Sequence, residues 1–512
     1  MFNKSTYCSF LVISFLFVIV NPVSAKSMGE KIASNGNSNG ATACIGCHAA
    51  NGSGLGAAGF PRLAGLNAVY LEKQLESFRT GSRANPVMAP IAKALTAKES
   101  KAIAEYYSRL KSASSATVDP NLSLEPGAYL VLRGSWPDRK LPACEQCHGP
   151  GGSGIGETFP ALAGQHASYI KTQILNWRNG KRKNDPNNLM KEVATRLNNN
   201  EIEAVANYYA SLDPLKAGNA AAKKIVNLKT QLNKKPVEKF EFFTPPMYGD
   251  YPDGPFGESV RNGEAIFTLS NSHATSKKYV GNHQQCVNCH LDAGRLANSA
   301  PMWASWPAYP AYRKKNNKVN DITMRIQGCF TYSMNAQASK AGKAPAAESK
   351  PITDLKAYMY WISSGAPTGD KNMPGRGYPK FKKTKLGYSP KRGKKVYAKN
   401  CAICHGTNGQ GVMRKSQTLF PPLWGNNAYN WGAGMHNVNK AAFFIKANMP
   451  LGLPNSLSDQ DAWDVSAYIN SQERPQDPRH KGNHKETAKK YHQGKYDFYG
   501  KQKTTNGKIL GE

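Results

Sequence analysis

Acidic residues are scarce in this chain of 512 residues, which has 34 Asp and Glu against 67 Lys and Arg. The formal net charge is therefore +33 at pH 7. Most of that charge is typical of a solvated, lysine-rich surface, but the summed field of such a surface also attracts small anions and acidic partners. The sequence contains no motif of a nucleic-acid-binding fold, so we expect no nucleic-acid partner.

Long apolar runs are missing after the N-terminus, so no later segment is predicted to span a membrane. The run from Phe10 to Val20 is itself too short, since a spanning helix needs about 20 apolar residues. It follows the positive Lys4 and precedes the small residues Val23-Ser24-Ala25. This order is typical of a secretory signal peptide, which we place at residues 1–25.

Cysteines that could pair as disulfides are also missing. Cys8 lies within the signal peptide, and eight of the other nine cysteines fall into four Cys-x-x-Cys-His pentads, which leaves no even set. Each pentad is typical of a c-type haem attachment site, in which two thiols bind the haem vinyl groups and the histidine binds the iron. The predicted thioether residues are Cys44, Cys47, Cys144, Cys147, Cys286, Cys289, Cys401 and Cys404, and the predicted iron ligands are His48, His148, His290 and His405.

We therefore predict four covalently bound haem c groups. Because covalent haem attachment requires export, the pentads agree with the signal peptide and predict a periplasmic protein. The first two pentads are 100 residues apart, and their surroundings repeat: Gly52–Gly56 matches Gly152–Gly156, and Phe60–Gly65 matches Phe159–Gly164. The second half repeats the same order of elements with different details.

The predicted fold is all-α, with four haem c domains in series, in which the haem supplies much of a core that about 90 residues build poorly alone. The segment before the third domain is rich in Lys, Ala and Pro and reads as a linker. The predicted boundaries are 26–113 and 114–214 for the first two domains, 215–252 for the linker, 253–370 for the third domain, 371–475 for the fourth, and 476–512 for a basic tail of unassigned fold.

The distal iron ligands are predicted from their spacing. Met88 and Met190 lie 40 and 42 residues past the histidines of the first two pentads. A methionine ligand gives a high-potential electron-transfer haem. In the fourth domain Met449, 44 residues past its histidine, is favoured over Met435, and His436 is a further alternative.

The third domain has a cysteine in the same position. Cys329 lies 39 residues past His290, whereas Met302 comes only 12 residues past it, and Met324 and Met334 flank the cysteine. Arg325 and Ser333 lie four residues to either side, so the three share one face of a helix. A guanidinium favours thiolate over thiol and binds oxyanions in bidentate fashion. We predict that Cys329 is both a haem ligand and a reactive group.

Four stretches of the second half carry a resemblance to a known family. They are Cys286 to Arg295, Arg325 to Asn335, Phe420 to Gly425, and Ala447 to Pro450. Together they resemble dihaem thiosulfate dehydrogenases, over about residues 256–475. The first half resembles the tandem dihaem cytochrome c that accepts electrons from that enzyme, and the whole chain is similar to natural fusions of the two.

The resemblance implies oxidative coupling of two thiosulfates to tetrathionate, and some members of the family also run the reverse reaction. It implies His290/Cys329 ligation, with Arg325, Ser333 and a second arginine, Arg313, near the substrate. Where some members carry Lys before the methionine ligand, this chain has Asn448, which favours steady His405/Met449 ligation. The implied partners are thiosulfate, tetrathionate and a periplasmic or membrane-bound electron acceptor, either a cytochrome or an oxidase.

Two other functions fit the pattern. One is a pure tetrahaem electron carrier, in which Cys329 would be an inert ligand. The other is the haem subunit of a sulfur-oxidation complex, which also has a Cys-ligated haem but acts on a cysteine of a carrier protein.

Overall fold

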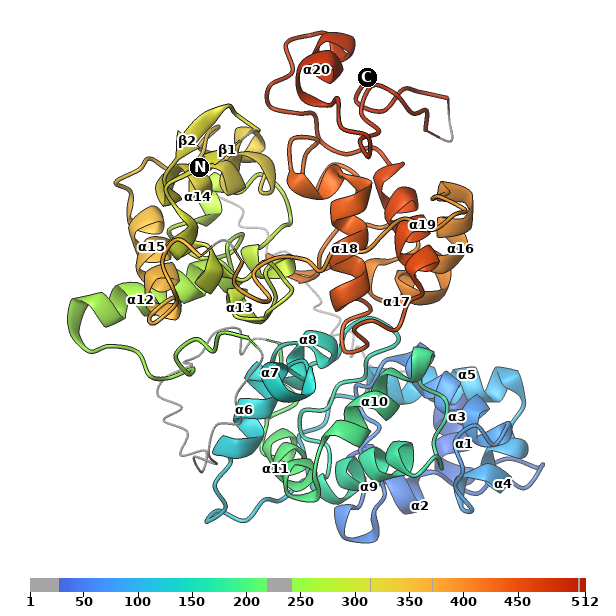
Figure 1. The fold of residues 1–512 in the computed structure, drawn as a ribbon. Coiled ribbons are helices and arrows are strands. Elements are labelled where there is room, and N and C mark those ends of the chain that lie inside the picture. Colours follow the sequence, from blue (N-terminus) through green and yellow to red (C-terminus); the bar gives the residue numbers. More distant parts are fainter. Residues whose placement is uncertain (1–26, 219–241, 314, 371, 505–506) are drawn as a thin grey trace, which may run out of the picture.

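The computed structural model describes residues 27–218, 242–313, 315–370, 372–504 and 507–512. The predicted signal peptide and most of the predicted linker lie outside these residues. Within them the all-α prediction is confirmed, since helices dominate and the strands form only two short antiparallel pairs (Figure 1). The 3-10 helices are η1 (Gly56–Ala58), η2 (Pro150–Gly152), η3 (Pro186–Asn188), η4 (Lys277–Tyr279), η5 (Cys286–Asn288), η6 (Met302–Ala304), η7 (Trp306–Ala308), η8 (Ala336–Ala338) and η9 (Gly434–His436).

The first two domains are built alike. The α-helices of the first are α1 (Met28–Asn35), α2 (Ile45–His48), α3 (Ala68–Arg79), α4 (Met88–Lys93) and α5 (Ala97–Arg109). Those of the second are α6 (Glu125–Arg133), α7 (Trp136–Arg139), α8 (Glu145–His148), α9 (Ala167–Arg178), α10 (Leu189–Arg196) and α11 (Asn199–Ala210). Capping boxes at Thr96 with Glu99 and at Asn198 with Glu201 start α5 and α11.

The third and fourth domains add short β-strands to the same plan. The third contains α12 (Gly254–Thr268), α13 (Leu291–Gly294), β1 (Ala311–Arg313), β2 (Lys318–Asn320), α14 (Ile322–Tyr332) and α15 (Lys350–Ile362). The fourth contains α16 (Pro390–Asn400), α17 (Ala402–His405), β3 (Val412–Arg414), β4 (Gln417–Phe420), α18 (Val438–Asn448) and α19 (Asp459–Asn470). β1 pairs with β2 and β3 pairs with β4.

In every domain the first helix crosses the last at a glycine. A Cβ atom on Gly29, Gly127, Gly263 or Gly393 would lie 2.1, 2.1, 2.0 or 1.9 Å from a backbone carbonyl oxygen of α5, α11, α15 or α19, respectively. No other residue permits backbones to approach so closely. The crossing therefore repeats in all four domains.

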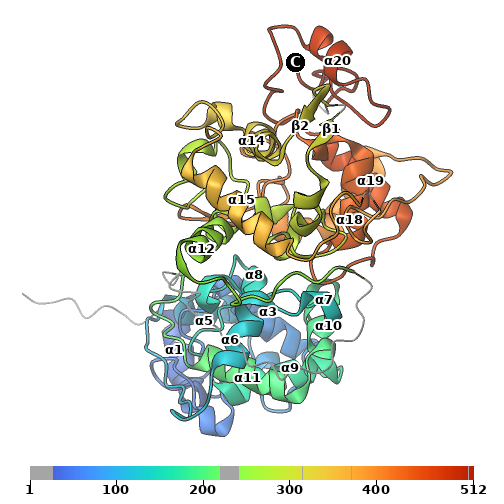
Figure 2. The same cartoon turned by 60° about the vertical axis from the view of Figure 1, so that its left-hand side comes forward.

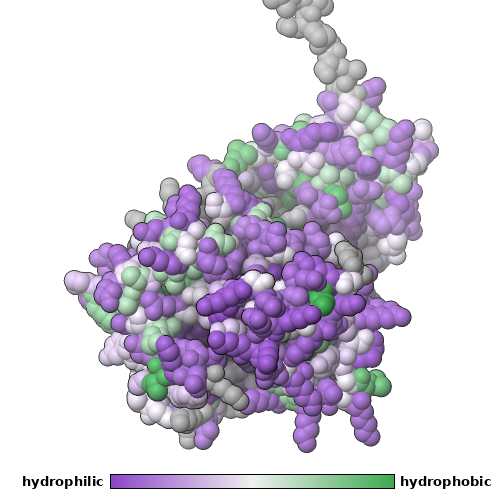
Figure 3. All heavy atoms as spheres, turned by 90° about the horizontal axis from the view of Figure 1, so that it is seen from above, coloured by the Kyte–Doolittle hydropathy of each residue, from purple (hydrophilic) through white to green (hydrophobic). Residues whose placement is uncertain are grey.

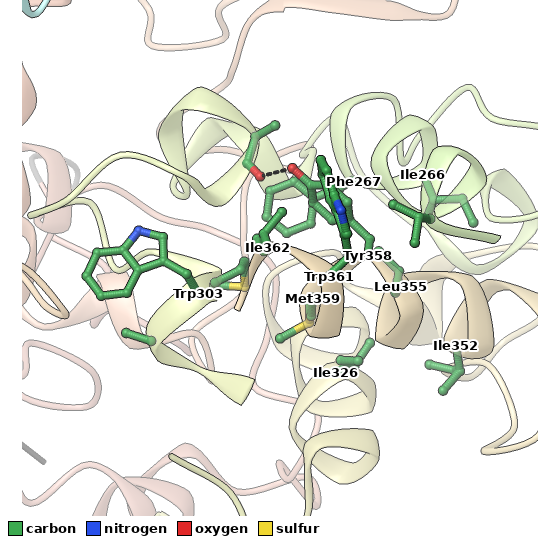
Figure 4. Packing of buried hydrophobic residues seen from close by; sticks show 14 of the residues in the cluster. Ile266, Phe267, Trp303, Ile326, Ile352, Leu355, Tyr358, Met359, Trp361 and Ile362 are labelled. Atoms are coloured by element: carbon green, nitrogen blue, oxygen red, sulfur yellow. Dashed lines mark hydrogen bonds between the residues drawn. The ribbon is translucent and has the colours of Figure 1, made fainter. Parts of the chain in front are cut away.

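The core of the third domain fixes the helix that carries Cys329. Ile326 and Phe330, four residues apart on α14, are buried against Leu355 and Met359 of α15. Figure 4 shows Ile326 below α15, with Phe267, Tyr358 and Trp361 on the other side of that helix. The Tyr358 hydroxyl donates to the Ala293 carbonyl oxygen at 2.7 Å, which ties α15 to the segment after the third pentad.

Residues 476–512, for which the sequence predicts no fold, form a compact segment on the fourth domain. It contains α20 (His484–Tyr491), and Phe498, Tyr499 and Leu510 pack with Trp431 and Trp463 in one buried cluster. Figure 3 shows the face of the molecule that includes this segment, where most exposed side chains are hydrophilic.

The two halves meet through the second domain. Figures 1 and 2 both place the third and fourth domains side by side above the first two. Arg133 at the end of α6 forms a 2.7 Å ion pair with Glu264 of α12, and both side chains are almost fully buried. The Arg133 guanidinium also stacks on the ring of Tyr248, 4.0 Å from its centroid. Arg196 donates to the Gly452 carbonyl oxygen at 2.8 Å, which adds a contact with the fourth domain.

We expect Glu264→Gln to destabilise the contact between the halves by about 3–5 kcal/mol, because it leaves the Arg133 charge buried without a counter-charge. Chemical denaturation followed by tryptophan fluorescence measures the loss. The matched control is Glu203→Gln, which breaks the exposed Lys171–Glu203 pair and should cost at most about 1 kcal/mol. Equal effects of the two substitutions would contradict the assigned role of the buried pair.

Candidate functional site

The four pentad histidines have the same orientation. Each Nδ1 lies 2.7–2.9 Å from a backbone carbonyl oxygen, of Pro61, Pro160, Ala300 and Pro421, respectively. Donation from Nδ1 leaves the Nε2 lone pair free, as an iron ligand requires. Burial lowers the pKa of all four histidines, for His290 to about 4, so each ring is neutral at pH 7.

Each of these histidines lines a cavity that also contains residues of its pentad and the predicted distal ligand. One of about 460 Å³ is lined by the pentads of the first two domains together with Met88 and Met190. A second, of about 360 Å³, is lined by Cys401, Cys404 and His405 with Met449 and Met435. A third, of about 240 Å³, is lined by Cys286, Cys289 and His290 with Cys329. Each predicted distal ligand therefore lines the same cavity as its histidine.

Two buried arginines provide a test of whether haem fits the cavity of the first two domains. Arg83 and Arg182 are 6% and 4% exposed, and the hydrogen-bond acceptors of their guanidinium groups are neutral Gln, Tyr and Asn side chains. Burial, and then the nearby Arg83, lower the pKa of Arg182. Buried cations need counter-charges, and haem propionates would supply them here. The residues fit the group.

The structure distinguishes one of the three candidate iron ligands of the fourth domain from the other two. Met449 and Met435 both line the second cavity, and Met435 lines the third as well. His436 lines neither, because its ring is buried elsewhere, with Nε2 2.8 Å from a carboxylate oxygen of Asp497. His436 is thus turned away from the iron site, whereas both methionines stay next to it.

The third cavity gathers the predicted reactive residues. Arg325 and Cys329 are one turn apart on α14, and Arg325 Nη1 lies 2.9 Å from Cys329 Sγ. Ser333 follows the end of α14, and Arg313 lies on β1. All four line the cavity beside His290. The thiol and the guanidinium therefore share one cavity with His290, the predicted iron ligand.

The cavity is cationic. None of the described residues that line it is acidic, and Arg376, from the segment before α16, lines it together with Arg313 and Arg325. Lys440 of α18 is close by: burial of its ammonium, then Arg313 and Arg325, lower its pKa. Sequence reasoning missed Arg376 and Lys440. Neither is near Cys329 in the chain, and no pattern marks them.

Lys315 is a further cation beside this cavity, although the residue as a whole is exposed. Its Nζ lies 3.4 Å from the centroid of the Tyr332 ring and donates to the Gly432 carbonyl oxygen at 2.5 Å. Burial of the ammonium, then Arg479 and Arg325, lower the pKa of Lys315 to about 7, while Asp477 and Cys329 oppose the shift. Its charge is therefore lost as pH rises through neutrality.

Known proteins match both halves. The family model for cytochrome c matches residues 33–111, 140–213 and 390–473, and the model for the SoxA/TsdA cytochrome c domain matches 274–368. Thiosulfate dehydrogenase of Stutzerimonas stutzeri is 50% identical over 273 residues, which are 53% of this chain and 85% of that protein. This chain belongs to the thiosulfate dehydrogenase family.

The family resemblance extends to the fused arrangement. The thiosulfate dehydrogenase electron acceptor of the same organism is 46% identical over 192 residues, 37% of this chain and 88% of that protein. The solved structure of the thiosulfate dehydrogenase TsdBA of Marichromatium purpuratum, in its as-isolated form, superposes with a TM-score of 0.87 at 45% identity. It covers 95% of this chain and 99% of its own. The cytochrome c domains of this chain hold covalently bound haem c.

Substitution of each methionine of the fourth domain tests which of the two is the iron ligand. We expect Met449→Leu to remove about one third of the methionine–iron charge-transfer absorbance, since three haems are predicted to have methionine ligands, and to change the potential of one haem. Met435→Leu, of similar volume, is the matched control and should leave the absorbance unchanged. Loss of the band in Met435→Leu alone would assign the ligand to Met435.

Proposed function

We propose that this protein is a periplasmic tetrahaem oxidoreductase that couples two thiosulfates to tetrathionate and passes two electrons to its N-terminal domains. The observation that carries the proposal is the Arg325–Cys329 pair in a cationic cavity beside His290. Membership of the thiosulfate dehydrogenase family supports it. The proposed cofactors are four haem c groups, ligated by His48/Met88, His148/Met190, His290/Cys329 and His405/Met449.

The cations of the cavity suit two dianions. Bringing two thiosulfates together is opposed by their mutual repulsion, which fixed positive groups in a buried site offset. Arg325 and Arg313 would hold the sulfonate groups, and Ser333 would donate a hydrogen bond from the opposite end of the α14 face. Arg376, Lys315 and Lys440 add to the positive field.

The proposed chemistry is covalent catalysis by Cys329. The Cys329 thiolate and the sulfane sulfur of one thiosulfate form an S–S bond, and two electrons leave. The sulfane sulfur of a second thiosulfate then attacks that bond on the thiosulfate side, which releases tetrathionate and restores the thiolate. The Arg325 guanidinium, in contact with Sγ, stabilises the thiolate as leaving group. Haem supplies the one-electron acceptors that the first step needs. The same two steps run in reverse would reduce tetrathionate.

Contacts between the cavities support a route for the electrons. Cys289 of the third domain also lines the cavity of the fourth, and Tyr429 and Met435 line both. Cys404 of the fourth domain and Cys147 of the second pack around one cluster of Ile155, Phe159 and Phe420. The two N-terminal sites share a single cavity. The proposed order is third, fourth, second and first domain, followed by a periplasmic or membrane-bound cytochrome or oxidase.

The described residues include no helix that is both long enough and apolar enough to pass through a bilayer. Periplasmic location rests instead on the predicted export signal and on covalent haem attachment.

A second candidate function is favoured by the family model of the third domain, whose description joins SoxA with TsdA. A haem subunit of a sulfur-oxidation complex would act on a carrier cysteine. Turnover of thiosulfate alone, with ferricyanide as electron acceptor and tetrathionate as measured product, distinguishes the two functions. Absence of turnover without a carrier protein would favour the second.

We expect Cys329→Gly to abolish tetrathionate formation, because the sulfur that carries the covalent adduct is gone. Haem content, measured by the pyridine haemochrome, and reduction of the N-terminal haems by dithionite should remain. Unchanged turnover would reduce the protein to an electron carrier in which Cys329 is only a ligand.

Activity should depend on the charge of Lys315. Its pKa of about 7 means that the cation is present below neutrality and lost above it, so KM for thiosulfate should rise between pH 6 and pH 8. Lys315→Met should raise KM at pH 6 and flatten this dependence, whereas Lys318→Met on β2, an exposed lysine of the same hairpin, should retain it. If the pH profile of KM in Lys315→Met is identical to that of the unsubstituted protein, the charge of Lys315 has no role in thiosulfate binding.

A further inference from the structure

A cluster of metal-binding side chains lies outside the haem sites. It joins His436 of η9 to His492 and Asp497 of the C-terminal segment 476–512. The side-chain ligand atoms of the three residues all lie within 4.8 Å of one another. The residues are 6%, 0% and 5% exposed, so the cluster is sealed from solvent.

The contact between His436 and Asp497 requires a cation, either a proton or a metal ion. His436 Nδ1 faces the carbonyl oxygen of Ala433 and must carry a hydrogen, which leaves Nε2 as a lone pair in the neutral ring. That Nε2 lies 2.8 Å from Asp497 Oδ2, an acceptor. Two lone pairs cannot meet at this distance without a cation between them.

The outer contacts are those of metal-bound histidines. A histidine that binds a metal through one nitrogen commonly donates its other N–H to a carboxylate or a backbone carbonyl. His492 Nε2 lies 3.0 Å from Asp477 Oδ2, and His436 Nδ1 donates to Ala433. Arg479 holds Asp477 through a bond of 2.9 Å from Nε to Oδ1. Both rings are thus oriented by groups that lie beyond the cluster.

The inner atoms converge on one point. Asp497 Oδ2 lies 2.8 Å from His436 Nε2 and 2.8 Å from His492 Nδ1. The ligands of a tetrahedral zinc ion, at about 2.0–2.1 Å from the metal, are about 3.3 Å apart. An ion would therefore need each pair to separate by about half an ångström. Asn437 Nδ2 lies 3.2 Å from His436 Nε2, so a flip of this amide would bring its oxygen to the fourth position; otherwise a water would complete it.

We propose that His436, His492 and Asp497 form a structural site for a divalent transition metal, with zinc matching the two imidazoles and one carboxylate. On binding, the ion takes the place of the proton on His492 Nδ1. The ion clamps the segment 476–512 to η9. Because Ala433 and Met435 of the same stretch line the cavity of Cys329, the clamp also fixes one wall of that cavity.

Metal analysis of the full-length holoprotein, purified without chelators, tests the proposal. The iron content measures the amount of protein, because each chain is proposed to hold four haems. Zinc should therefore be present at about one quarter of the iron. His492→Gln and Asp497→Asn should each lose the zinc while they keep the iron. The matched control is His480→Gln, a histidine of the same segment whose Nδ1 contacts Thr487 Oγ1 and no carboxylate. Zinc retained by His492→Gln would overturn the site.

A second measurement keeps the test independent of how the variants fold. The wild-type holoprotein is dialysed against a chelator, which leaves covalent haem in place, and is then titrated with zinc. We expect uptake of one equivalent, a rise in the unfolding temperature, and a zinc X-ray absorption spectrum with nitrogen and oxygen ligands at about 2.0–2.1 Å. No uptake and an unchanged unfolding temperature would show that the cluster is held by hydrogen bonds alone. Neither result depends on thiosulfate turnover.

Discussion

The close crossing of the first and last helices is the constraint on which each domain depends. Gly29, Gly127, Gly263 and Gly393 bring one backbone against the carbonyl oxygens of the other helix. With this crossing fixed, the pentad follows the first helix in the chain. Its histidine then lies where a loop carbonyl can accept from Nδ1. The four pentad histidines therefore have one orientation, and the predicted iron sites differ in the residue on the opposite wall.

Neighbouring sites lie close together because adjacent domains share the residues that line their cavities. One cavity serves both N-terminal pentads, and Met435 belongs to two cavities at once. The contact between the halves is made by the second domain, whose pentad packs near that of the fourth. The spatial order of the sites therefore differs from the order of the domains along the chain.

Much of this could be predicted from local patterns. The pentads, the helical character and the Arg325–Cys329 face depend on residues within one turn or one short motif, and the chain there has few other choices. Arg376 and Lys440 could not be predicted, because both lie far from Cys329 in the sequence: Arg376 lines the cavity from the segment before α16, and Lys440 lies beside it on α18. The packing of residues 476–512 was missed for a similar reason: its core depends on Trp431 and Trp463, which lie elsewhere in the sequence. The choice between Met449 and Met435 stays a prediction, since both line the cavity.

The buried Arg133–Glu264 pair has a kinetic consequence. An enzyme and a separate carrier must meet by diffusion, so their exchange slows on dilution and, for charged proteins, with added salt. Here the donor and acceptor domains are parts of one chain and are joined by a pair that solvent ions scarcely reach. Transfer between the halves is therefore a first-order event, independent of protein concentration and only weakly dependent on ionic strength. Only the last electron transfer, to an external acceptor, still depends on protein concentration and ionic strength, because it requires a collision between two molecules.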